Sequence, residues 1–196
     1  MTSLDSKSQM IEEQERRFAY LLASRVIEKP KLSIWMILVP IIFVYFFYRF
    51  NQYKAGRHEF VKNFMISRKR ALEAARQTAA TGSSVDLDAL AQQAELPPEA
   101  RKSYREFLKI FNDYYLDLLQ AKGKNFNALV RSTFKSKTDY LIQLNRFNQI
   151  EKELNAALRP QIADTTDGFN EIVGIIEQNS AELRRNDADS FFASDF

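Results

Sequence analysis

The feature that most restricts how this chain can fold is an uncharged, strongly apolar stretch between Lys31 and Arg49. Seventeen consecutive residues there carry no charge. At about 1.5 Å of rise per residue, 32–50 is long enough for a helix across roughly 30 Å of hydrocarbon. A buried helix of a soluble bundle would normally keep one polar stripe, whereas every helical face here is apolar. We therefore predict a transmembrane helix over 32–50. Its membrane-embedded residues are Ile34, Trp35, Met36, Ile37, Leu38, Val39, Pro40, Ile41, Ile42, Phe43, Val44, Tyr45, Phe46, Phe47 and Tyr48.

Two arrangements of this stretch in a membrane are open. Trp35 lies near one end and Tyr45 and Tyr48 near the other, as in the aromatic belts of membrane-spanning helices. Pro40 lies near the middle, where the missing backbone donor kinks a helix. The first interpretation is a kinked single span. The alternative is a re-entrant hairpin with both ends on the same side, which the basic residues on both flanks also fit.

The positive charge of the chain is concentrated directly after the apolar stretch. The net charge is only +3, but 49–76 contains eight Lys/Arg against two Glu, and 77–196 has a net charge of −4. A basic segment beside an apolar one is typical of a membrane surface with anionic lipids, whereas a nucleic-acid-binding protein spreads basic residues over its folded face. We predict no nucleic-acid partner. The predicted lipid-headgroup contacts are Lys31, Arg49, Lys54, Arg57, Lys62, Arg68, Lys69 and Arg70.

The same basic residues set the predicted orientation. Residues 49–70 contain seven Lys/Arg and residues 12–31 contain five. For a single span, the side with more Lys/Arg faces the cytoplasm. We therefore predict a membrane localisation with the C-terminal part of the chain on the cytoplasmic side.

The rest of the chain predicts an all-α fold. Residues 1–31 hold an amphipathic helix, which lies on the membrane surface or packs on the C-terminal part. A basic helix over 51–80 continues the membrane segment. Residues 81–186 form a small antiparallel helical bundle, and 187–196 is an acidic, aromatic tail.

Within the bundle, turn and capping residues separate the predicted helices. A short helix ends at Ala94, and the next begins at Pro98 and ends near Gly123. A long helix is predicted over 125–158, where Pro160 stops it. The last helix follows the loop 162–167.

The residues needed for ordinary catalysis are missing. The chain has no cysteine, a single histidine (His58) and five isolated glycines. Disulfides, thiolate metal sites, cysteine nucleophiles and glycine-rich phosphate loops are therefore ruled out. We expect no enzyme, no catalytic or metal-binding residue, no cofactor and no small-molecule substrate.

These features predict a non-catalytic, membrane-anchored helical protein that acts as an interaction scaffold or assembly factor. Sixteen Phe and eight Tyr offer aromatic surface for a protein partner or for self-association. The alternative is a monotopic lipid-binding or membrane-remodelling protein whose hairpin bends at Pro40. A third possibility is an accessory subunit of a membrane enzyme or transporter.

Overall fold

The protein is described by a computed structural model over residues 2–27, 56–94, 96–161 and 169–193. Within these ranges the chain is all-α and contains no strand, so the predicted all-α class and the presence of a helical bundle are confirmed. The α-helices are α1 (Leu4–Ile27), α3 (Gly56–Thr81), α4 (Leu87–Gln92), α5 (Pro98–Gln120), α6 (Phe126–Thr133), α7 (Lys137–Leu158) and α8 (Phe169–Phe191), with a 3₁₀ turn at Arg159–Gln161.

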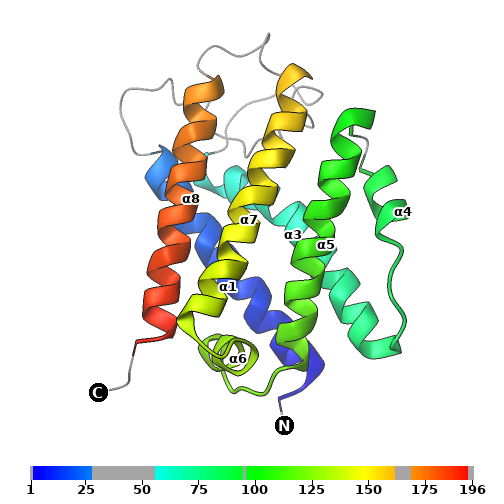
Figure 1. The fold of residues 1–196 in the computed structure, drawn as a ribbon, viewed down its shortest axis with the longest axis vertical. Coiled ribbons are helices and arrows are strands. Elements are labelled where there is room, and N and C mark those ends of the chain that lie inside the picture. The colour runs from blue at the N-terminus through cyan, green and yellow to red at the C-terminus, as the bar shows by residue number, and fades with distance from the viewer. Residues whose placement is uncertain (1, 28–55, 95, 162–168, 194–196) are drawn as a thin grey trace.

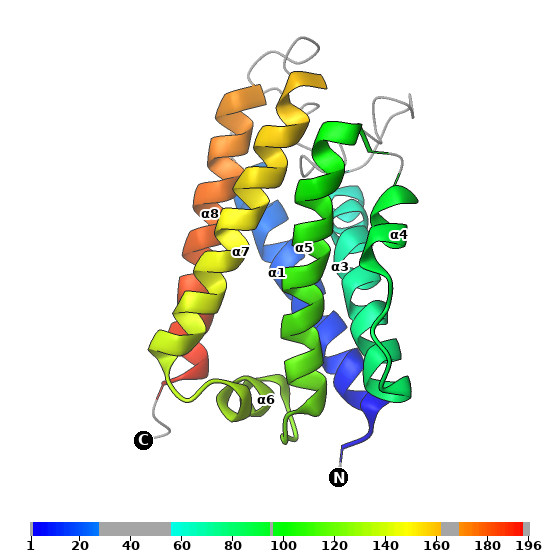
Figure 2. The same ribbon diagram turned by 45° about the vertical axis from the view of Figure 1, so that its right-hand side comes forward.

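The five longest helices, α1, α3, α5, α7 and α8, pack against one another in one bundle (Figures 1 and 2). Helices α1 and α7 run in one direction, and α3, α5 and α8 run in the other (Figures 1 and 2). Helix α4 lies beside α5, and α6 closes the end of the bundle at which α1 begins and α8 ends. At the opposite end of the bundle, α1 ends and α3 begins. The end of α1 before residue 28 and the start of α3 after residue 55 therefore lie at the same end of the bundle.

The core consists of two clusters of buried apolar side chains. The larger is aromatic and centres on α5, whose stripe of Phe107, Phe111 and Tyr115 recurs every four residues and is almost fully buried. The ring centroids of Phe111 and Phe147 of α7 are 4.3 Å apart. Burial of each such side chain stabilises the fold by about 1.5–3 kcal/mol. The aromatic stripe therefore joins α5 to α7.

The smaller cluster lies at the end of the bundle where α1 ends and α3 begins. It joins Leu22 and Val26 of α1 to Phe60 and Phe64 of α3, with Ile172 of α8 beside them. Because the apolar face of α1 is buried here and in the main core, α1 is part of the bundle, which is the second of its two predicted positions.

Helix α3 matches the described part of the helix predicted over 51–80. It ends at Thr81, and Gly82 follows with a φ of 73°. The Gly82 N–H donates to the Thr78 carbonyl at 2.9 Å, which closes the last turn. Among the described residues, no helix is both long and apolar enough to cross a membrane. The predicted membrane segment 32–50 lies outside the described residues.

The prediction of one helix over 125–158 is wrong. Helix α6 ends at Thr133, Phe134 is extended, and α7 begins at Lys137. The Asp139 N–H donates to Ser136 Oγ at 3.1 Å, and the Ser136 hydroxyl donates to an Asp139 carboxylate oxygen at 2.9 Å. This reciprocal cap starts a new helix, so the chain turns there and α6 can cross the end of the bundle.

Candidate functional site

Four charged side chains from four helices meet inside the bundle and form a buried ion network. Arg68 of α3 donates from Nε to Glu15 of α1 at 2.7 Å and from Nη2 to Glu151 of α7 at 2.6 Å. Arg184 of α8 donates to both carboxylate oxygens of Glu151, at 2.8 and 2.7 Å, and also to Asn148. The side chains of Arg68 and Arg184 are only 4% and 6% exposed.

Aromatic rings cover both guanidinium groups. The Arg68 guanidinium carbon lies 3.7 Å from the Phe64 ring centroid and 4.7 Å from that of Phe111. The Arg184 carbon lies 5.3 Å from the Phe18 centroid. Cation–π contact of this kind is most favourable where water is excluded. The rings therefore take the place of water around the two cations.

The network is balanced, because two arginines face two carboxylates. Burial alone would raise the pKa of Glu151, but Arg184 and Arg68 together hold that pKa below its ordinary value. Burial likewise opposes the charge of Arg68, while Glu15 and Glu151 raise its pKa. Glu151 and Arg68 therefore both stay ionised at neutral pH. Because each carboxylate of the network is paired with an arginine from another helix, the network can fix how the four helices pack.

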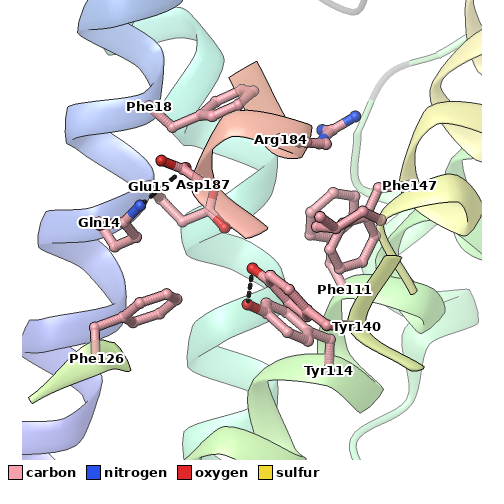
Figure 3. Close-up of a pocket in the computed structure, with 11 residues that line it drawn as sticks. Gln14, Glu15, Phe18, Phe111, Tyr114, Phe126, Tyr140, Phe147, Arg184 and Asp187 are labelled. Atoms are coloured by element: carbon pink, nitrogen blue, oxygen red, sulfur yellow. Dashed lines mark hydrogen bonds between the residues drawn. The ribbon is translucent and has the colours of Figure 1, made fainter. Parts of the chain in front are cut away.

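A small cavity of about 30 Å³ borders the network (Figure 3). Its polar wall includes the hydroxyls of Tyr114 and Tyr140, which lie 3.4 Å apart, and the Asp187 carboxylate, which accepts from Gln14 Nε2 at 3.2 Å. Burial raises the pKa of both Asp187 and Tyr140. A space of this size holds one or two waters and no organic ligand.

No cluster that could hold a metal occurs in the described ranges. Within them, no three His, Cys, Asp or Glu side chains converge closely enough to ligate an ion. The carboxylates of the buried network are already held by arginines. We therefore assign no metal or cofactor to the described residues.

On the outside of the bundle, an open groove of about 290 Å³ runs between α1 and α3. Two apolar side chains at its edge are unusually exposed, Tyr20 at 42% and Ile66 at 38%. We call it the α1–α3 groove. Its lining consists of Arg16, Tyr20, His58, Val61, Lys62, Met65, Ile66 and Lys69.

Seven of the eight predicted headgroup contacts fall into three groups, and Arg68 is a separate case. Arg57, Lys62 and Lys69 are exposed, and the last two line the groove. Arg70 is partly buried, and its Nη1 donates to the Tyr104 hydroxyl at 3.4 Å. Three others lie outside the described residues: Lys31, Arg49 and Lys54.

The prediction for Arg68 is wrong, because its side chain lies in the core. Its basic neighbours in the sequence suggested an exposed collar. However, Arg68 comes four residues after Phe64 and four before Leu72, both of which are buried. Its position on the apolar stripe of α3 is the signal that could have revealed the burial.

Sequence reasoning also missed the other three members of the network, Glu15, Glu151 and Arg184. Glu151 stands four residues after Phe147 and three before Leu154, which places it on the buried stripe of α7. Arg184 directly follows the buried Leu183. A charged residue in such a register indicates a buried ion pair, but which helices supply its partners depends on the tertiary fold.

The fold and the network define the class of the protein: an all-α bundle locked by a buried ion network, with an amphipathic groove on its surface. Comparison of the chain with protein-family models, with curated proteins and with solved structures finds no match. What the protein does must therefore follow from its own fold and chemistry.

Proposed function

We propose that the protein is a monotopic membrane protein: its bundle stands on one face of a bilayer, and 32–50 enters that bilayer as a hairpin bent at Pro40. The observation that carries this proposal is the packing of α1 on α3. Val26 shares a buried cluster with Phe60 at one end of the pair, and Arg76 is ion-paired with Asp5 at 3.2 Å at the other. The two helices that flank the apolar stretch are therefore antiparallel neighbours.

This packing favours the hairpin over the single span. A single crossing would place α1 and α3 on opposite sides of the membrane. That would break the contact between Leu22 and Phe60 in the smaller cluster. It would also break the 2.7 Å ion pair between the Glu15 carboxylate and the Arg68 guanidinium. A hairpin keeps both flanks on one side and leaves the core intact.

The apolar sequence supports the same arrangement. The two halves on either side of Pro40 have about eight to ten residues each, which is half the length that a crossing helix needs. A helix–turn–helix of that size reaches into one leaflet and returns. Proline is tolerated in membrane helices where neighbouring groups satisfy the freed carbonyl.

The hairpin also strengthens the predicted orientation. With both flanks on one side, the five Lys/Arg of 12–31 and the seven of 49–70 all lie on the same face of the membrane. The positive-inside preference then favours the cytoplasmic side for the whole bundle. In this proposal the protein is a non-catalytic, lipid-attached bundle. An assembly role with a protein partner and the accessory-subunit alternative stay predictions.

Labelling of introduced cysteines tests the topology, because the chain has none of its own. Gln9→Cys lies before the apolar stretch and Ser84→Cys after it, and both positions are exposed. Each variant is treated with a membrane-impermeant maleimide in sealed vesicles, and detergent-opened vesicles give the full labelling level. The hairpin predicts equal protection at both positions. Opposite protection would establish a single span and overturn the proposal.

Extraction tests the attachment itself. Membranes washed with alkaline carbonate are expected to retain the chain, and an Ile37→Lys, Ile42→Lys variant is expected to be released, because a charge in hydrocarbon is costly. Recovery of the unaltered chain in the soluble fraction would contradict the proposed membrane attachment.

A further inference from the structure

We infer that the α1–α3 groove binds the headgroup of an anionic phospholipid. This inference rests on the membrane attachment proposed above and names the class of lipid that the bundle recognises. It also assigns a role to Arg16 and Tyr20, which were not among the headgroup contacts predicted from the sequence.

The groove combines the two properties that a phospholipid presents. Its cations are Arg16 on α1 and Lys62 and Lys69 on α3, and its floor includes the apolar side chains of Val61 and Met65. An anionic headgroup pairs with the cations, while the glycerol and the first acyl carbons need an apolar surface. A nucleic acid or an acidic peptide would make no use of that floor.

The charge balance within the groove leaves room for an anion. One carboxylate, Glu12, is shared between Lys69 at 2.8 Å and Arg16 at 2.7 Å. Lys62 has only a 3.7 Å contact to Glu59, and its side chain is 65% exposed. An exposed pair at that distance is weak, so the Lys62 ammonium is available to a phosphate.

The position of the groove fits a membrane ligand. It lies between the second half of α1 and the first half of α3, the halves that adjoin 28–55. The exposed Tyr20 at its edge has the amphipathic ring that settles at headgroup depth. By contrast, Lys122 and Lys124 directly precede α6, which lies at the other end of the bundle.

The test measures which lipids the full chain retains. The chain is reconstituted in phosphatidylcholine bilayers with a minority of phosphatidylglycerol and released in a mild detergent, and bound lipids are counted by native mass spectrometry. The unaltered chain is expected to enrich phosphatidylglycerol. Lys62→Gln, Lys69→Gln is expected to lower that enrichment about tenfold, since each cation near an anionic surface contributes several-fold.

A matched pair of lysines serves as the control. Lys122→Gln, Lys124→Gln removes the same charge at the other end and is expected to leave the enrichment unchanged. An equal loss in both double variants would show a general charge effect and overturn the inference, as would an unchanged enrichment in the groove variant. If the double variant misfolds, Lys62→Gln alone can replace it, because the Lys62 side chain is exposed. This single variant is also expected to lower the enrichment of phosphatidylglycerol.

Two further measurements separate the possible outcomes. Displacement of phosphatidylglycerol by inorganic phosphate would identify a site for free anions and overturn the lipid assignment, whereas Ile66→Ser is expected to weaken lipid retention without creating phosphate sensitivity. The groove variant is expected to stay in carbonate-washed membranes. If the variant stays in the washed membranes but has lost its preference for phosphatidylglycerol, the loss is due to the groove, and the proposed membrane attachment is intact.

Discussion

At the scale of single residues, the ion network matters more for specificity than for net stability. A buried ion pair is often no more stable than well-packed apolar side chains, but removing one partner leaves a costly uncompensated charge. Glu15 accepts from Arg68, and the structure shows no other cation within ion-pair distance of Glu15 among the described residues. The network therefore penalises any packing that separates α1 from α3.

Arg68→Met is expected to destabilise the fold by about 3–5 kcal/mol, because it leaves the largely enclosed Glu15 without a cation and removes one of the two arginine partners of Glu151. The measurement is the free energy of unfolding of the full chain in mild detergent, followed by circular dichroism in denaturant. Arg70→Met is the control, since its single 3.4 Å bond is weak and its loss should cost less than about 1 kcal/mol. Equal effects of the two changes would contradict a central role for the network.

Two partly buried carboxylates, Glu151 and Asp187, are expected to respond to pH in opposite directions. The pKa of Glu151 is lowered in the fold, so its contribution is complete above its ordinary value of 4.5 and is lost as pH falls through the folded pKa. Burial raises the pKa of Asp187, so its ionised form costs stability above the folded pKa, and this cost disappears as pH falls towards and below its ordinary 3.8.

The pair of variants makes this measurable. Glu151→Gln is expected to destabilise the chain at pH 7, and Asp187→Asn to stabilise it. Both differences from the unaltered chain should shrink in acid. Denaturant unfolding at a series of pH values from neutral to acid measures the two curves. Differences that are independent of pH would show that neither carboxylate titrates differently in the folded chain.

At the scale of elements, the turn between α5 and α6 requires a residue without a side chain. A Cβ on Gly123 would lie 2.7 Å from the Leu129 backbone nitrogen and 2.9 Å from the Ala128 carbonyl carbon. Backbone atoms cannot move aside as the end of a long side chain can. The close approach allows α6 to fold back across the end of the bundle.

Gly123→Ala is therefore expected to destabilise the fold by about 1–3 kcal/mol. The matched control is Gly174→Ala in α8, where nothing lies within 4 Å of the added carbon. Alanine there should stabilise the helix by about 0.5–1 kcal/mol. Thermal unfolding of the two variants should shift in opposite directions. A shift in the same direction would contradict the close contact at Gly123.

The elements differ in how far the sequence alone could predict them. Helix α5 was predictable because its buried residues recur every three or four positions from Tyr104 to Leu119. The break between α6 and α7 was not predicted, because apolar spacing continues through Phe134 and only the Ser136 cap interrupts the helix. The position of Arg68 on the apolar stripe of α3 indicated burial, but its partner Glu15 lies fifty-three positions away in the sequence, so the ion pair itself could not be predicted.

At the scale of the whole molecule, the adjacent ends of α1 and α3 make a soluble version of the bundle possible. Replacing 28–55 with about ten Gly/Ser residues gives a linker with a root-mean-square reach of about 17 Å, and packed helices lie about 8–10 Å apart. The shortened chain is expected to fold without detergent and not to bind phosphatidylcholine vesicles, which offer the α1–α3 groove no anionic headgroup. Light scattering, circular dichroism and flotation with vesicles measure these outcomes. If the shortened chain still floats with these vesicles, the bundle surface and not the apolar stretch is responsible for membrane attachment.

The positions where α1 begins and α8 ends have a consequence for anything joined to the chain. Both lie at the pole that α6 closes, opposite the end that adjoins 28–55. Helix α8 has 23 residues, which corresponds to a length of about 35 Å. With the membrane attachment proposed above, the bundle would act as a spacer. A fluorophore or fused domain at either terminus would then stand that far above the lipid headgroups and face the aqueous compartment.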